Sequence, residues 1–160
     1  MNNRDVISDI ELLIYDCDGV LTDNKVIVDE NGKESVVFNR GDGFAISKIK
    51  KDLGIKQIII STEKNPIIIK RCEKLNIEAI NGIEDKEQMV KSYCDNNGID
   101  LRHVMFIGND LNDKCAMEIV GFTGCPLDAE YEIKTISNWI SEKKGGDGVI
   151  RDLYRCLTKG

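Results

Sequence analysis

The sequence predicts an α/β fold of three layers, in which helices cover both faces of a parallel central sheet. Short apolar runs, typical of buried strands, alternate along the chain with segments that have helical spacing. Polar residues follow directly after several of these runs, where the strands of such a sheet end. The length of 160 residues suits one domain, so we expect residues 1–160 to form a single domain.

Apolar runs bounded by polar or turn residues predict the strands of the sheet. In chain order they are 11–16, 57–61, 78–80, 103–107, 121–124 and 139–140. A separate hairpin is predicted as well, because Asn31-Gly32 is a strong turn signal and lies between the β-rich runs 26–28 and 35–38. We expect this hairpin to be a small insert in the fold.

Segments with helical spacing follow most of the predicted strands: 44–53, 66–75, 85–98, 111–120, 130–135 and 149–157. Gly54 favours a stop after the first helix, and Asn65 with Pro66 favours a start for the second. Asp85 begins a capping box for the third. Such an order indicates a Rossmann-like fold, in which ligands bind at the carboxyl ends of the strands.

Composition excludes several classes of function. The net charge is −6 and no block of Lys or Arg stands out, which argues against a nucleic-acid partner. The longest apolar stretches, such as Ile58–Ile60, are too short to cross a membrane, and no charged leader precedes an apolar run, so we expect a cytoplasmic location. Six cysteines without a C-x-x-C pair, beside the single His103, argue against zinc and for reduced thiols.

Two carboxylates follow the first predicted strand. Asp16 and Asp18 are separated by one residue, and Gly19 lets the chain turn sharply behind them. Two acids at one strand end repel each other unless a divalent cation lies between them, and hard cations prefer oxygen ligands. An acidic pair that merely begins a loop is the alternative interpretation, and D-x-D alone does not decide between the two.

Two further residues have the chemistry to hold an anion. Ser61 ends the second predicted strand, where its hydroxyl and the N–H groups after it could bind a phosphate oxygen. Lys86 lies in the first turn of a helix, where the helix dipole disfavours a cation, so an anionic neighbour is implied. An ordinary polar residue at a strand end and a solvated surface lysine are the alternatives.

The segment GNDLND at 108–113 combines a glycine with four oxygen-rich side chains and resembles a metal-binding loop. Its alternative interpretation is a cluster of helix-capping residues, because Asn and Asp are favoured before helices. The parallel sheet brings this loop to the same edge as Asp16 and Ser61, which favours a shared site.

These motifs together, DCDGVLTD at 16–23, Ser61, Lys86 and GNDLND at 108–113, resemble the haloacid dehalogenase superfamily of phosphohydrolases. The resemblance covers roughly residues 10–157. It is strongest to the small branch without a separate cap domain that contains 3-deoxy-octulosonate 8-phosphate and nonulosonate (sialic-acid-type) 9-phosphate phosphatases. The hairpin insert, FNRGDG at 38–43 and GGDGVIR at 145–151 carry that closer likeness. The C-terminal domains of some CMP-sialate synthetases look similar.

The resemblance implies the catalytic roles. Asp16 would be the nucleophile that forms an aspartyl phosphate. Asp18 would protonate the leaving sugar oxygen and then activate water. Ser61 and Lys86 would hold the transferring phosphoryl group.

The resemblance also implies a Mg²⁺ site made of Asp16, the backbone carbonyl of Asp18 and Asn109, with Asp110 and Asp113 supporting the loop. Position 109 is Asn, where hydrolases of this branch usually carry Asp. An amide oxygen can coordinate Mg²⁺ but supplies no charge.

The implied substrate is a phosphorylated 3-deoxy-2-ulosonic acid, either a nonulosonate 9-phosphate or an octulosonate 8-phosphate. Glu63 and Lys74 match the residue types of the nonulosonate enzymes, which slightly favours the nine-carbon acid. The candidate substrate-binding residues are Arg40, Glu63, Arg71, Lys74 and Arg151. A charged, solvated helix face is the alternative interpretation of those on the helix after Ser61.

We expect a homotetramer, because a lone hairpin is marginally stable in water and packing against copies of itself would cover its edges. The resemblance to this branch implies the same arrangement, with hairpins of four copies packed together. The glycines at 145–148 could let the chain reach a neighbouring active site, where Arg151 would pair with a substrate carboxylate. The alternative is a simple turn before the last helix.

Three functions remain open at this point. The first is a phosphatase of sialic acid or lipopolysaccharide biosynthesis, which the presence of Asp16, Asp18, Ser61 and Lys86 favours. The second is a non-catalytic or weakly active assembly or regulatory domain, which Asn109 favours. The third is transfer of the phosphate to another sugar, which would use the same residues.

Overall fold

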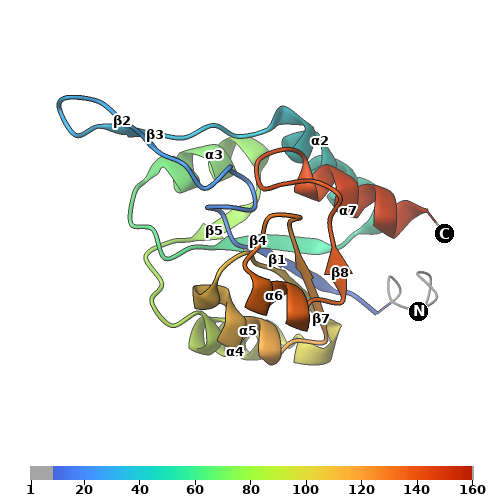
Figure 1. Cartoon of the computed structure of the whole chain (residues 1–160). Coiled ribbons are helices and arrows are strands. Elements are labelled where there is room, and N and C mark those ends of the chain that lie inside the picture. The colour runs from blue at the N-terminus through green and yellow to red at the C-terminus, as the bar shows by residue number, and fades with distance from the viewer. Residues whose placement is uncertain (1–8, 160) are drawn as a thin grey trace.

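A six-stranded parallel sheet forms the centre of the molecule, as the computed structural model of residues 9–159 shows (Figure 1). The strand order is β5-β4-β1-β6-β7-β8, and all neighbours are parallel. The strands are β1 (Leu12–Tyr15), β4 (Lys56–Ile60), β5 (Glu78–Ile80), β6 (Val104–Ile107), β7 (Phe122–Cys125) and β8 (Trp139–Ile140). The predicted α/β fold with a parallel sheet is therefore confirmed, and β1 lies between β4 and β6.

Helices cover both faces of this sheet (Figure 1). One face carries α2 (Arg40–Lys48), α3 (Ile67–Leu75) and α7 (Val149–Thr158). The opposite face carries α4 (Lys86–Asn97), α5 (Lys114–Glu118) and α6 (Tyr131–Ile136). Short 3₁₀ turns occur at Leu101–His103 and Leu111–Asp113. None of the helices within residues 9–159 has the length and apolar character that crossing a membrane requires.

The strand β1 shows why both faces need a helical layer. Leu12 and Ile14 belong to the core under α4, α5 and α6, whereas Leu13 and Tyr15 belong to the core under α2, α3 and α7. All four side chains are fully buried, as the alternation of side chains along a strand requires when both faces are covered. The strand is thus held rigidly, and so is the residue that follows it.

The hairpin insert consists of β2 (Ile27–Val28) and β3 (Glu34–Ser35), which pair antiparallel and project from the body of the molecule (Figure 1). Gly32 adopts a φ of +78° at its turn, a conformation that favours glycine. The second strand ends earlier than the predicted 35–38. Large apolar side chains on and beside the hairpin are exposed: Val26, Ile27, Val28 and Val37.

The boundaries of one helix differ from the prediction. We expected a helix over 44–53, but α2 begins at Arg40, because the side chain of Asn39 accepts a hydrogen bond from the Gly41 backbone N–H at 2.7 Å and caps the helix. Two glycines in the first turn hid this start from the helical pattern. The helix continues as a π-helical turn, Ile49–Leu53.

Candidate active site

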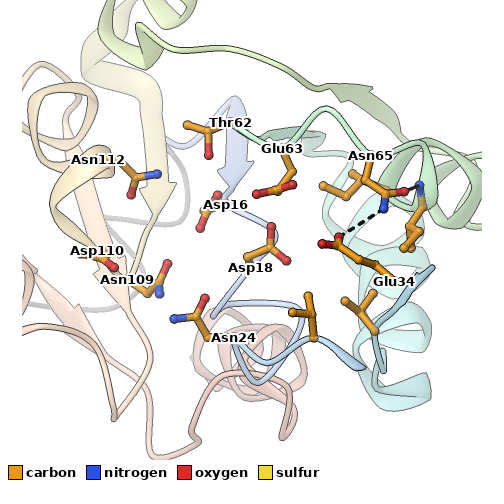
Figure 2. A pocket seen from close by; sticks show the side chains of 14 residues that line it. Asp16, Asp18, Asn24, Glu34, Thr62, Glu63, Asn65, Asn109, Asp110 and Asn112 are labelled. Carbon is orange, nitrogen blue, oxygen red and sulfur yellow. Dashed lines mark hydrogen bonds between the residues drawn. The ribbon is translucent and has the colours of Figure 1, made fainter. Parts of the chain in front are cut away.

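The site lies at the carboxyl ends of three neighbouring strands. Asp16 follows β1, Ser61 follows β4, and Asn109 lies two residues beyond β6. A pocket of about 310 Å³ opens here (Figure 2). Its lining residues are Asp16, Asp18, Asn24, Val26, Glu34, Val36, Thr62, Glu63, Asn65, Ile67, Ile68, Asn109, Asp110 and Asn112.

Lys86 is buried beneath this pocket and holds two carboxylates. Its Nζ atom donates to Oδ1 of Asp16 at 2.7 Å and to Oδ1 of Asp113 at 2.6 Å. Burial by itself lowers the pKa of Lys86, but the two carboxylates outweigh that effect and raise it. Lys86 is therefore a fixed cation below Asp16, and the anionic neighbours expected from its position in the first turn of α4 are these two acids.

The carboxyl group of Asp16 lies in an environment that opposes its charge. Burial and the nearby carboxylate of Asp113 raise its pKa, and the ammonium of Lys86 opposes this shift. One positive charge thus faces two buried carboxylates. A further cation beside Asp16 would balance them, which favours a divalent metal at this position.

Asn109 completes a set of three polar groups that converge on one point. Its terminal amide faces both Oδ2 of Asp16 and the backbone carbonyl oxygen of Asp18. When the amide presents its oxygen to them, three oxygens meet, as a hard cation such as Mg²⁺ requires. When it presents nitrogen, Nδ2 donates to Asp16 at 2.9 Å and to Asp18 at 3.0 Å. The donor set therefore fits Mg²⁺, with Asp16, Asp18 and Asn109 as the residues that would hold it.

The loop that carries Asn109 is fixed by Asp113. Oδ2 of Asp113 accepts hydrogen bonds from the N–H groups of Asn109 at 2.9 Å and Asp110 at 3.3 Å. Asp110 in turn accepts from the Leu111 N–H at 2.6 Å, and the two acids form a capping box. The loop therefore suits both interpretations of this segment, because Asp113, which caps the turn, also orients Asn109.

Asp18 lines the same pocket, and its side chain lies next to that of Asp16 (Figure 2). Burial and then the carboxylates of Glu63 and Glu34 raise its pKa, against the lowering effect of Lys86. Gly19 follows with a φ of +91°, and a Cβ there would lie 2.0 Å from the terminal amide of Asn109. Glycine at position 19 is therefore needed for Asn109 to approach Asp18.

Ser61 is buried at the end of β4, in the strand next to β1. Its Oγ accepts a hydrogen bond from the N–H of Glu63 at 3.1 Å, which turns the chain so that Thr62 and Glu63 face the pocket. Asp16, Asp18 and Ser61 follow neighbouring strands at one edge of the sheet, and Lys86 contacts Asp16 from below. The motifs therefore gather where the carboxyl ends of parallel strands were expected to bring them.

Of the five predicted substrate-binding residues, only Glu63 lines this pocket. Arg71 lies with its guanidinium 5.6 Å from the ring of Phe38, and Arg151 lies 4.6 Å above the ring of Phe44. Arg40 and Lys74 are likewise absent from the lining among residues 9–159. No Lys or Arg among residues 9–159 lines this pocket, and the binding roles of Arg40, Arg71, Lys74 and Arg151 stay predictions.

Residues 145–148 contact their own chain in a way that suits a turn before the last helix, and their reach toward a neighbouring active site stays a prediction. The N–H of Gly146 donates to the carbonyl of Val20 at 3.1 Å, and the N–H of Gly145 donates to Oδ1 of Asp128 at 2.9 Å. A Cβ at Gly145 would lie 2.1 Å from the carbonyl oxygen of Gly19. These glycines pack against the loop after β1 of their own chain.

Asn112 belongs to the predicted loop 108–113, but the sequence did not identify four other polar residues of the lining, namely Asn24, Glu34, Thr62 and Asn65. Glu34 comes from β3 of the hairpin and accepts a hydrogen bond from the Asn65 side chain at 3.4 Å (Figure 2). The Asn-Gly turn indicated the hairpin, but no local pattern shows that it folds beside the strand ends. The side chains of a hairpin that lies next to a catalytic motif would have been the signal to inspect.

Comparison with known proteins agrees with this geometry. A family model described as haloacid dehalogenase-like hydrolase matches residues 7–153. The chain is 31% identical over 159 residues to the 3-deoxy-D-manno-octulosonate 8-phosphate phosphatase KdsC of Escherichia coli K12. The aligned region covers 97% of this chain and 84% of that protein. It is 26% identical over 145 residues to the N-acylneuraminate cytidylyltransferase A of Danio rerio, covering 89% of the chain but only 34% of that longer protein.

Solved structures show the same fold. The 3-deoxy-D-manno-octulosonate 8-phosphate phosphatase of Moraxella catarrhalis, in complex with magnesium, phosphate and KDO, is 28% identical with a TM-score of 0.92, over 98% of this chain and 90% of that one. The cobalt-bound phosphatase of Haemophilus influenzae is 27% identical with a TM-score of 0.88, over 95% and 89%. The chain therefore belongs to the haloacid dehalogenase-like hydrolases, as a phosphatase homologous to the 3-deoxy-octulosonate 8-phosphate phosphatases.

Proposed function

We propose that this phosphatase hydrolyses a phosphorylated 3-deoxy-2-ulosonic acid, a nonulosonate 9-phosphate or an octulosonate 8-phosphate. The observation that carries the proposal is the carboxylate of Asp16, which lines the pocket and is held by Lys86 at 2.7 Å. The relatives whose names specify such a substrate support the sugar class.

In the proposed reaction, a carboxylate oxygen of Asp16 attacks phosphorus and the bond between phosphorus and the sugar oxygen breaks. Asp18 gives its proton to the departing sugar oxygen, and its raised pKa favours the protonated form that this step needs. Asp18 then takes a proton from water as the water attacks the aspartyl phosphate. This second step releases inorganic phosphate and restores both acids.

The remaining residues position the phosphoryl group. Lys86 fixes the carboxylate of Asp16. The N–H of Glu63 already donates to Oγ of Ser61, so the Ser61 hydroxyl and the N–H of Thr62 would supply the donors to phosphate oxygens. Mg²⁺ bound by Asp16, Asp18 and Asn109 would neutralise the charge between carboxylate and phosphate. Asp113 keeps Asn109 in place through its backbone N–H.

The lining bears on the proposed assembly. The pocket is lined by five acidic residues and by no Lys or Arg of the described residues. The acidic residues are Asp16, Asp18, Glu34, Glu63 and Asp110. A substrate carboxylate would therefore lack a counter-charge within one chain. We propose a homotetramer in which a basic residue of a neighbouring copy meets that carboxylate, with the exposed hairpins as the contact between copies.

We place the reaction in the cytoplasm. All six cysteines, Cys17, Cys72, Cys94, Cys115, Cys125 and Cys156, are free thiols in the structure. Free thiols in this number are typical of a reducing compartment.

The test is a panel of phosphorylated sugar acids with eight and nine carbons, ranked by kcat/KM, with neutral sugar phosphates for comparison. The proposal expects the two acids to rank first. Equal or better turnover of a neutral sugar phosphate would overturn the proposed substrate while leaving the phosphatase chemistry intact.

The second candidate is a weakly active assembly or regulatory domain. Asn109 and the match to part of the longer cytidylyltransferase favour it. Release of phosphate from a generic phosphate ester, measured with and without Mg²⁺, separates the two. Turnover that needs Mg²⁺ supports the enzyme, whereas the absence of turnover on every ester supports the second candidate.

A further inference from the structure

The amide of Asn109 can turn but the rest of the residue cannot. Its backbone N–H donates to Oδ2 of Asp113 at 2.9 Å, and its carbonyl accepts from the N–H of Glu130 at 2.9 Å. The residue is only 8% exposed, and Gly19 lies directly against its side chain. The remaining freedom is a half-turn of the terminal amide, a broad, roughly two-fold torsion that exchanges nitrogen and oxygen.

The two orientations of this amide suit two different states of the site. With Nδ2 inward, the NH₂ group has two protons for two acceptors, Oδ2 of Asp16 at 2.9 Å and the carbonyl oxygen of Asp18 at 3.0 Å. With the oxygen inward, the same position holds three oxygens that repel one another unless a cation lies among them. An aspartate at position 109 would have only the second arrangement.

We propose that Asn109 is a two-position amide that takes the place of the cation when the metal is absent. In the metal-free enzyme its NH₂ group bridges Asp16 and Asp18. When Mg²⁺ binds, the amide turns and offers its oxygen as a ligand. The site therefore stays assembled without metal, and Mg²⁺ binds less tightly than it would beside an aspartate, because it must displace two hydrogen bonds and gains no charge from position 109.

The orientation of the Asn109 amide can be measured without substrate, so the outcome is independent of the proposed sugar. The test compares the wild type with Asn109→Asp, which keeps the shape but removes both donors and adds a charge. Asn31→Asp is the matched control, because it makes the same change at an exposed position in the turn of the hairpin, outside the lining of the pocket.

Thermal unfolding and calorimetric titration with MgCl₂ supply the first readouts. In chelator, we expect Asn109→Asp to unfold about 4 °C or more below the wild type, because two carboxylates then face each other without a bridge. In saturating Mg²⁺ the gap should close, with a Kd for Mg²⁺ lower by about tenfold or more. Asn31→Asp should shift neither quantity by a comparable amount. An equal unfolding temperature for the metal-free wild type and Asn109→Asp would overturn the proposal.

The second readout does not depend on the variant folding. In a ¹⁵N-labelled wild type, the side-chain NH₂ signals of Asn109 should show slow exchange with water in chelator, as expected for a hydrogen-bonded amide. On titration with MgCl₂ these signals should shift and lose that protection, because the nitrogen then turns away from Asp16. Signals that are unprotected in chelator, or unchanged by saturating Mg²⁺, would overturn the proposed half-turn.

Discussion

The Nζ atom of Lys86 lies 2.7 Å from Oδ1 of Asp16, and both side chains are almost wholly inaccessible, at 1% and 6% exposure. Removing one partner of a buried ion pair leaves an uncompensated charge, which costs about 3–5 kcal/mol. Lys86→Met would leave both Asp16 and Asp113 in that state. We therefore expect its free energy of unfolding to fall by about that amount, with loss of turnover.

Urea unfolding measures this change, and Lys91→Met on the same helix is its control. Lys91 pairs with Glu87 at the surface, where an ion pair contributes at most about 1 kcal/mol. If Lys86→Met proved as stable as Lys91→Met, the charge balance described for the site would be wrong.

Asp16→Asn keeps the size of the side chain and an oxygen that can accept from Lys86, so we expect the fold to persist. Turnover should fall by several orders of magnitude because the amide is not a nucleophile. Asp18→Asn should lose about 10²–10⁴-fold, the usual value of general acid–base help. Phosphate release is the measurement, with circular dichroism to show that each variant folds. Near-wild-type release by Asp16→Asn would contradict the mechanism.

Binding of Mg²⁺ should weaken as pH falls. Burial and Asp113 raise the pKa of Asp16, and a proton on that carboxyl competes with the cation. Below the raised pKa, the apparent Kd for Mg²⁺ should increase by about tenfold for each pH unit. Isothermal titration calorimetry between pH 8 and pH 5 checks this, and a Kd that does not change with pH would refute it.

Removal of divalent metal should abolish activity, which an assay of phosphate release in the presence of chelator measures. Activity that survives exhaustive chelation would refute the metal requirement.

Asp42 links α2 to α7 and should make stability depend on pH. Its Oδ1 accepts from the Arg151 backbone N–H at 3.0 Å, while Oδ2 has no hydrogen-bond partner among residues 9–159. Burial raises its pKa from 3.8 to about 6, although hydrogen bonds from the N–H groups of Arg151 and Ile150 oppose the shift. Since the folded value exceeds the unfolded one, its contribution to stability is complete below about pH 4 and is lost as pH rises through about 6.

Asp42→Asn does not titrate, so the free energy of unfolding of this variant should rise relative to the wild type between pH 4 and pH 7. The relative gain is roughly 3 kcal/mol at most, from 1.36 kcal/mol for each pKa unit. Denaturant unfolding at several pH values measures the difference. Parallel stability curves for the two proteins would show that Asp42 is not buried in a way that opposes its charge.

The hairpin should hold copies of the chain together. Ile27 is 64% exposed and Val28 is 58% exposed, an unusual state for adjacent large apolar residues. The wild type should sediment well above its 18.0 kDa monomer, and Ile27→Asp combined with Val28→Asp should dissociate it. Tyr131→Asp, which changes an exposed apolar residue on α6, is the control and should leave the oligomer intact. A wild type that sediments as an 18.0 kDa monomer would contradict the homotetramer.

The strands and their order along the chain were predictable because local apolar runs specify them. The run predicted at 57–61, for example, corresponds to β4 at Lys56–Ile60, and Ser61 follows directly after it. The proximity of Asp16, Ser61 and Asn109 was also predictable, since parallel strands bring their carboxyl ends to one edge. Local pattern thus suffices where a strand end alone positions the residue.

The missed features depend on contacts between distant parts of the chain. Nothing near Glu34 indicates that it meets Asn65, 31 residues away, across the mouth of the pocket. The basic residues Arg71 and Arg151 have the chemistry to bind a carboxylate, but each lies over an aromatic ring instead. Residue type predicts what a side chain can bind, whereas tertiary packing decides where it lies.

The contact of Gly145 and Gly146 with the loop after β1 has a consequence for the timing of synthesis. The backbone N–H of Gly146 donates to the carbonyl oxygen of Val20. The segment fits here only because Gly145 has no side chain, since a Cβ at this position would collide with Gly19. The loop that carries Asp18 thus gains its backing from residues made more than a hundred positions later. We expect a nascent chain on the ribosome to lack phosphatase activity until that segment has left the exit tunnel, even after β1, β4 and β6 are complete.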